Sequence, residues 1–251
     1  MNVLFVLATI LFILMVLVGG KKGLRSFLSL FFNFIVLIIS IYFMLIFRIS
    51  PIIVTIITCV VISCINLFFV NEVNGKTKVA FISTLITMFL LLLFIEKVTK
   101  ITMIQGFGSE QSEALAPFSL YIGVDFFKIE TSVIIMSTIG AVTEVAISMT
   151  SSMREALYHN PLIGKKKLFL YGIRIGKDIL GTDTNTLFFA FYGGYMALLL
   201  WFHDLPYSVG KIVNSKLFSA EVISILCAGI GIALIIPITS FIYAYFSAET
   251  E

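Results

Sequence analysis

Long apolar runs, separated by short polar turns, fill most of this 251-residue sequence. A helix that crosses a bilayer needs about 20 mostly apolar residues, within a range of about 17–25. We therefore predict seven transmembrane helices, at Val3–Gly19, Leu24–Phe47, Pro51–Val70, Val79–Ile95, Glu130–Thr150, Thr182–Trp201 and Leu217–Phe246. The last run is longer than a span requires, and helix tilt accommodates the excess. The predicted fold is all-α, a single polytopic bundle of transmembrane helices covering residues 1–251.

The first four runs are joined by very short connections, at Gly19–Gly23, around Pro51 and at Asn71–Lys78. Asn74-Gly75 is a turn signal within the last of these. Connections this short leave no room for an intervening domain, so the pattern predicts a series of antiparallel helical hairpins.

The segment Lys166–Gly181 has a different pattern, because charged residues alternate with apolar ones. Leu168, Tyr171, Ile175 and Ile179 share one helical face, and the charged side chains lie mostly elsewhere. At the centre of a bilayer each charge would cost about 2.5–3.5 kcal/mol. The pattern predicts an amphipathic helix on the inner membrane surface. The other non-spanning stretch, 96–129, is expected to be an outer loop of a length that is often functional.

Composition places these helices in a membrane, since 59% of the residues are hydrophobic and only 12% are charged. Soluble domains carry about 25% charged residues. The net charge of +3 is small and the basic residues sit in short clusters, which argues against nucleic acid as a partner. No basic residue precedes the first run, so we expect an uncleaved first helix with its N-terminus outside.

The distribution of basic residues favours the same orientation, with the C-terminus in the cytoplasm. The predicted inner loops hold eleven basic residues: Lys21, Lys22, Arg25, Lys76, Lys78, Arg154, Lys165, Lys166, Lys167, Arg174 and Lys177. The predicted outer loops hold six: Arg48, Lys97, Lys100, Lys128, Lys211 and Lys216.

Glu144 is the leading candidate for chemistry, because ionisable residues inside a membrane are costly and often functional. It belongs to a polar stripe with spacings of three and four residues: Ser137, Gly140, Glu144, Ser148, Ser151 and Glu155. At about 1.5 Å per residue, Glu144 lies roughly 20 Å from the outer end of its helix and about 9 Å from the inner end. This depth predicts a proton or ion site.

Asp183 is the second candidate, at the start of a span rich in polar residues that include Thr184 and Asn185. By the same rise it lies about 6 Å inside the membrane. Together with Glu144 and Ser148, these side chains could surround one polar cavity. The alternative is that they only hold helices together, and Gly140, Gly193 and Gly194 would suit close helix packing. Glu221, near the outer face, is expected to be an interfacial carboxylate.

Motifs for enzyme chemistry do not occur in the sequence. There is no phosphate-binding GxxxxGK[ST] loop and no HExxH zinc motif. His159 and His203 lie in separate predicted loops, so no metal site is expected. We therefore expect neither a cofactor nor an enzymatic activity. Cys59, Cys64 and Cys227 all fall in apolar runs and are expected to be buried free thiols.

Two sequence runs resemble the YibE/F family of bacterial multipass membrane proteins. They are Gly140-Ala-Val-Thr-Glu-Val-Ala-Ile-Ser-Met-Thr-Ser151 and Gly181-Thr-Asp-Thr-Asn-Thr-Leu-Phe-Phe-Ala190. The short chain is most similar to the YibF-type member, and Glu144 stands where family members often carry Asp. The resemblance implies a location in the bacterial cytoplasmic membrane and a YibE-like membrane protein as partner in a hetero-oligomer.

A weaker likeness is to one half of the SecF and RND-type permeases. A polar helix, an amphipathic helix and a Thr/Asn-rich helix follow in the same order, here Gly140–Glu155, Lys166–Gly181 and Thr182–Ala190. The outer loop 96–129 departs from that pattern.

Two hypotheses of function remain. The first is a membrane permease or permease subunit, in which Glu144 carries a proton or binds a cation and Asp183, Ser148, Thr184 and Asn185 line the path. The second is a non-transport role as a scaffold, an assembly partner or a receptor for an extracellular ligand, which the loop 96–129 favours. Besides the lipid bilayer and the YibE-like partner, a second copy of the chain is a possible partner.

Overall fold

The structure, a computed structural model, describes residues 3–106, 125–204 and 207–247. Apart from two π-helical turns, its regular structure consists of α-helices, and no strand occurs in these three ranges. The helices are α1 Val3–Phe47, α2 Pro51–Cys64, α3 Gly75–Thr102, α5 Phe126–His159, α6 Lys165–Asp204, α7 Val209–Val213 and α8 Lys216–Ile242. The π-helical turns η1 (Ile65–Phe69) and η3 (Tyr243–Ser247) extend α2 and α8. The predicted all-α fold is confirmed.

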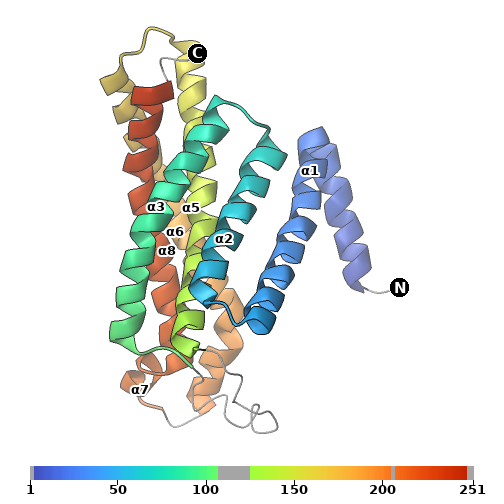
Figure 1. Cartoon of the computed structure of the whole chain (residues 1–251), viewed down its shortest axis with the longest axis vertical. Helices are drawn as coiled ribbons and strands as arrows, with labels where there is room; N and C mark the ends of the chain where they lie inside the picture. Colours follow the sequence, from blue (N-terminus) through green and yellow to red (C-terminus); the bar gives the residue numbers. More distant parts are fainter. Residues whose placement is uncertain (1–2, 107–124, 205–206, 248–251) are drawn as a thin grey trace.

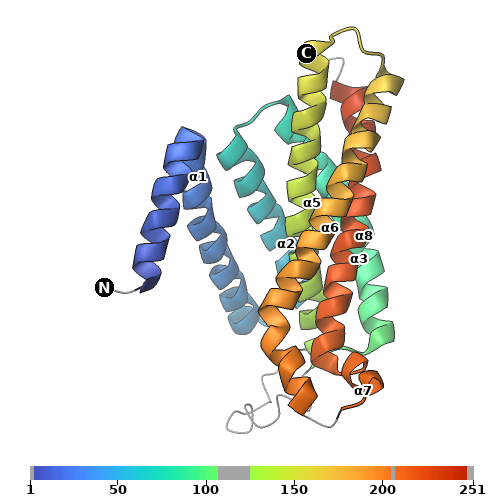
Figure 2. The same ribbon diagram turned by 180° about the vertical axis from the view of Figure 1, so that it is seen from behind.

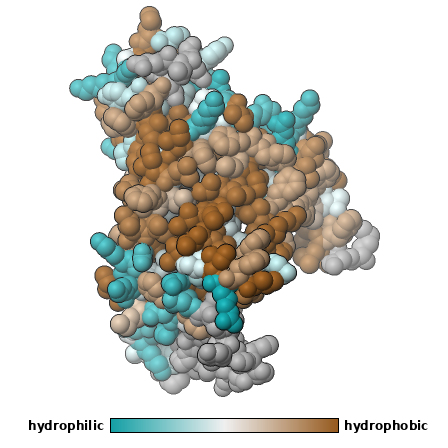
Figure 3. Space-filling view, viewed as in Figure 1, coloured by the Kyte–Doolittle hydropathy of each residue, from teal (hydrophilic) through white to brown (hydrophobic). Residues whose placement is uncertain are grey.

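Six of the described helices are long and apolar enough to cross a membrane, and the short α7 is not among them. Hydrophobic side chains gather over the middle of the face shown in Figure 3, and hydrophilic ones lie toward the two ends. Such a belt is expected for a bundle that is solvated by lipid between two polar boundaries.

Helix α1 is broken at Gly20, whose φ of 54° and ψ of −133° are not helical. Glycine adopts a positive φ without the steric cost that a side chain adds. The two halves fold back on each other (Figure 1), and a Cβ atom at Gly23 would lie 1.7 Å from the Met15 carbonyl oxygen. The predicted runs Val3–Gly19 and Leu24–Phe47 are therefore the two arms of one helical hairpin.

The core lies where α3, α5 and α8 meet, and the α1 hairpin stands at its periphery (Figures 1 and 2). A Cβ atom at Gly231 of α8 would lie 2.9 Å from side-chain atoms of Thr138 and Val142 on α5, and 3.1 Å from Leu91 on α3. In contrast, the buried residues of α1 are all small: Gly23, Ser29 and Ser40. The bundle is thus tightly packed at its centre and loosely attached to its first hairpin.

Helix α6 corrects one prediction, because Lys166–Gly181 continues without a break into the predicted span Thr182–Trp201. The segment is amphipathic as predicted, with Leu168, Gly172 and Gly176 buried, but its buried face contacts protein. A Cβ atom at Gly172 would lie 2.6 Å from Ser240 Oγ, and one at Gly176 would lie 2.2 Å from Ile236. These glycines let α8 approach α6, so the separate surface helix is wrong.

Helix ends also differ from the predicted boundaries, since α3 and α5 extend beyond the runs Val79–Ile95 and Glu130–Thr150. Helix α3 begins at the predicted turn with a capping box, in which the Thr77 amide donates to Asn74 Oδ1 over 3.1 Å. Of the predicted outer loop 96–129, both ends are helical and residues 107–124 lie outside the described part of the chain.

Candidate functional site

The depth of Glu144 follows from its neighbour Thr143, whose hydroxyl oxygen lies 3.3 Å from Ser63 Oγ on α2. Ser63 is twelve residues beyond Pro51, the first residue of α2, and this separation corresponds to about 18 Å along the helix axis. Glu144 therefore lies deep within the bundle's length, at the depth that its sequence position predicts.

Glu144 lies on the exposed face of α5, together with Ser137, Gly140 and Ser148. Its neighbours Thr143 and Val145 are buried instead, so the polar stripe points away from the core of this chain. A Cβ atom added at Gly140 would have no other atom within 4 Å. Within the described ranges, Glu144 makes no hydrogen bond or ion pair with another residue. The result is an unpartnered carboxylate on an open surface at membrane depth.

Asp183 lies deeper than its sequence position suggests, because Gly181 is not the start of a helix. The next residue, Thr184, has its methyl group 3.7 Å from a Cβ atom placed at Gly229. Gly229 is midway along α8, about 20 Å from either end of that helix. Asp183 is half-buried, and its carboxylate accepts a hydrogen bond from Thr182 Oγ1 at 3.4 Å.

The other predicted site residues have different environments. Ser148 and Asn185 are exposed, whereas the Thr184 hydroxyl oxygen is buried and lacks a hydrogen-bond partner in the described structure. None of the hydrogen bonds or ion pairs among the described residues joins Glu144 to Asp183. One chain brings both carboxylates to the interior depth of the membrane but does not link them directly, so their shared site stays a prediction.

Helix α6 also exposes Arg174, Lys177 and Asp178 at unexpected depth. They flank Gly176, which packs against Ile236, about 9 Å from the end of α8. Charged side chains at this depth are costly next to lipid. Both α5 and α6 therefore carry exposed polar groups at levels where the other helices are apolar.

The glycines predicted to mediate helix packing do not do so within this chain. Cβ atoms at Gly140, Gly193 and Gly194 would meet nothing within 4 Å. Gly172, Gly176 and Gly231 provide the close approaches instead, at the distances given above. Exposed glycines in transmembrane helices typically let a second helix approach. Any packing role of Gly140, Gly193 and Gly194 therefore concerns another chain.

Sequence reasoning missed a cluster at the opposite end of α5, α6 and α8 from His159. There the Tyr195 hydroxyl donates a hydrogen bond to the Glu221 carboxylate, and Glu130 is near enough to act electrostatically on both. Glu221 was expected to be an isolated interfacial carboxylate. Only the relative register of three helices unites these residues, and no spacing in the sequence reports that register.

The structure offers little to a metal ion, since no group of three or more His, Cys, Asp or Glu side chains in the described part of the chain could hold one. The sequence model of the YibE/F-like protein family matches residues 7–249, which is nearly the whole chain. No curated protein and no solved structure matches the chain significantly.

Proposed function

Since the chain belongs to the YibE/F-like family of membrane-helix proteins, we propose that it is a subunit of a membrane permease in which Glu144 carries a proton or binds a cation. One observation carries the proposal: Glu144 is exposed and unpartnered at a depth where its surroundings are apolar. A carboxylate in such a place tends to take up a proton unless a cation or hydrogen-bond donors stabilise its charge.

A second membrane protein completes the site in this proposal. Direct contact of an ionised carboxylate with lipid near the bilayer centre would cost about 2.5–3.5 kcal/mol. The exposed Gly140 beside Glu144, and Gly193 and Gly194 on α6, leave space for a helix of another subunit to approach. The family resemblance suggests a YibE-like protein for this role, and a second copy of the chain is the alternative.

Asp183, Ser148, Thr184 and Asn185 are supporting groups in this account. Thr184 supplies a buried hydroxyl oxygen without a partner, and Ser148 extends the exposed stripe by one helical turn from Glu144. Uptake of a proton or cation changes the local charge and thereby biases two arrangements of the helices. Asp183 acts on the same equilibrium from α6.

The rival function is assembly or scaffolding without transport. Two polar pairs favour it, because Ser63 and Thr143, and Asn33 and Asn66, already join helices of this chain through side-chain hydrogen bonds. If Glu144 does the same with a partner, it is dry and holds a fixed hydrogen bond. If it serves transport, its protonation responds to the aqueous phase.

Infrared difference spectroscopy of the complex purified from native membranes separates these roles. The protonated carboxyl band that appears as the pH is lowered should be lost in Glu144→Gln and shifted in Glu144→Asp. Asp178→Asn, which removes an exposed carboxylate of α6 outside the proposed path, is the matched control and should retain the band. An identical pH response in the parent protein and Glu144→Gln would contradict the proposal.

A further inference from the structure

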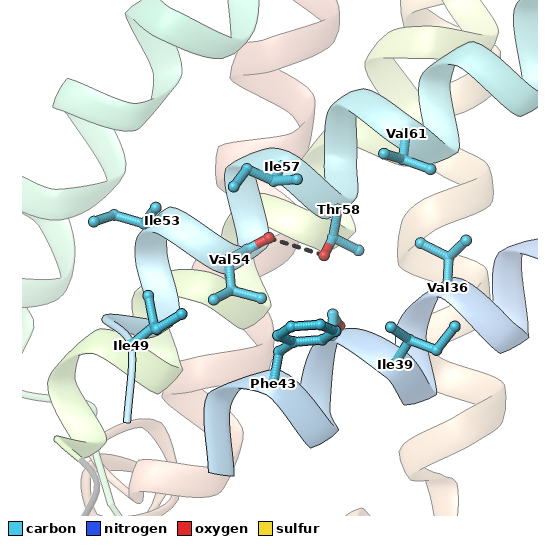
Figure 4. A pocket seen from close by; sticks show the side chains of 10 residues that line it. Val36, Ile39, Phe43, Ile49, Ile53, Val54, Ile57, Thr58 and Val61 are labelled. Carbon is cyan, nitrogen blue, oxygen red and sulfur yellow. Dashed lines mark hydrogen bonds between the residues drawn. The ribbon is translucent and has the colours of Figure 1, made fainter. Parts of the chain in front are cut away.

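An apolar cavity of about 500 Å³ separates the second arm of α1 from α2 (Figure 4). Its walls include Val36, Ile39 and Phe43 from α1 and Ile53, Ile57 and Val61 from α2. Ser40 and Thr58 also line it, but their hydroxyls donate to the carbonyl oxygens of Leu37 and Val54, over 2.7 Å and 2.8 Å. The cavity therefore presents no free hydrogen-bonding group from these side chains.

Helices α1 and α2 are held together beyond one end of this cavity only. Asn33 Nδ2 donates to Asn66 Oδ1 over 2.8 Å, and the rings of Phe32 and Phe69 lie 5.5 Å apart. The cavity occupies the other half of the interface, toward the connection that joins the two helices. The peripheral hairpin is thus anchored at one end, with a gap at the other.

The length of the cavity matches one leaflet of a bilayer. It extends along α2 from Ile49, beside the helix start, to Val61. These twelve residue steps correspond to about 18 Å, and half of a hydrocarbon core of about 30 Å is roughly 15 Å. An acyl chain that enters from the interface would reach the bilayer midplane within this space.

Arg48 stands at the mouth of the cavity, next to the lining residue Ile49. It is exposed in the connection between α1 and α2, with a φ of 49°, and among the described residues it has no hydrogen-bond or ion-pair partner. Guanidinium groups bind phosphate through paired hydrogen bonds. The apolar cavity and its cationic mouth together match a molecule with one phosphate and a long apolar chain.

We propose that this cavity binds one phospholipid, with an acyl chain between α1 and α2 and its phosphate on Arg48. A transmembrane helix does not fit. A helix about 18 Å long and 10 Å wide fills roughly 1,400 Å³, which exceeds the space between the two walls. The volume lies within the range of about 300–1,000 Å³ that is usual for small-ligand sites. The lipid fills the gap beside α1 and supports the hairpin against the bundle.

Native mass spectrometry of the delipidated protein in mild detergent tests this site. The parent chain should retain about one phospholipid, and Ile57→Trp, which fills the cavity, should lose it. Val36→Phe fills it from the opposite wall and guards against misfolding of the first variant. Arg48→Gln should retain the lipid about tenfold more weakly, because a charge-assisted hydrogen bond is removed.

Matched controls are Ile41→Trp, on an exposed α1 position outside the cavity, and Lys97→Gln, an exposed cation at the same end of the bundle. Both should bind lipid as the parent does. Unchanged lipid retention in the folded Ile57→Trp and Val36→Phe proteins would overturn the proposal. So would a loss of oligomer mass rather than lipid mass in these variants, because it would identify protein as the occupant.

Discussion

Ser63 of α2 and Thr143 of α5 lie within hydrogen-bonding distance, with 3.3 Å between their hydroxyl oxygens. This pair fixes the level of Glu144, the next residue of α5, within the length of the bundle. It also shows that one side of α5 is turned into the core, and Glu144 lies on the side that is not. A membrane-embedded carboxylate that avoids its own core is the basis of the proposed transport site.

Replacement of Glu144 by Gln should abolish the cellular phenotype or transport of the protein while expression and assembly stay near normal. Glutamine keeps the size and much of the hydrogen bonding of the side chain but not its charge. Asp183→Asn should act in the same direction. Activity assays alongside immunoblots of purified membranes would measure both effects, and normal activity of both variants would remove the main reason to propose a permease.

Gly176→Ala should destabilise the protein by about 1–3 kcal/mol, because its new methyl group would overpack the contact with Ile236. Gly181→Ala, five residues further along α6, meets no atom within 4 Å and should be neutral or stabilising by up to about 1 kcal/mol. Thermal unfolding in detergent would compare the two. Equal effects would contradict the continuous packing of α6 against α8.

Asn33 and Asn66 should show a favourable coupling energy of about 0.6 kcal/mol in a double-mutant cycle, the average for interhelical hydrogen bonds in a membrane protein. The single replacements Asn33→Leu and Asn66→Leu each leave the other amide unpaired, and the double variant leaves neither. Stability measurements on the four proteins would provide the coupling. Strict additivity would show that this bond does not hold α1 to the bundle.

The N-terminus should lie outside the cell and the C-terminus inside, as the eleven-to-six distribution of basic residues predicts. Seven crossings, with α1 as a hairpin, place the two ends on opposite sides. Cysteines added at each end, in a background without Cys59, Cys64 and Cys227, can be labelled from one side of the membrane. Labelling of both ends from the same side would refute the seven-span topology.

Much of the fold could be predicted because each helix leaves a local signature. The break at Gly20 falls inside the predicted turn Gly19–Gly23, and the cap of α3 is the predicted turn residue Asn74. Hydropathy reports such boundaries directly. Continuity of α6 could not be predicted this way, because its charged first half violates the apolar pattern, and the contact of Gly176 with Ile236 depends on tertiary packing.

The candidate site was predictable in part for the same reason. The depth of Glu144 follows from helical rise alone, and the structure agrees. The depth of Asp183 was underestimated because it was counted from a helix start at Gly181 that does not exist. The direction of each side chain, outward for Glu144 and toward Glu221 for Tyr195, depends on helix rotation, which the sequence leaves open.

The most direct test of the central claim is the access of water to the Glu144 stripe in the assembled complex. Ser148→Cys keeps Glu144 and lies on the same exposed face, and Ile86→Cys on α3 is an exposed control within the apolar belt. In native membranes, after removal of the natural cysteines, a charged thiol reagent should modify Cys at position 148 but not at position 86. Protection of both positions would contradict a water-accessible permease site at Glu144.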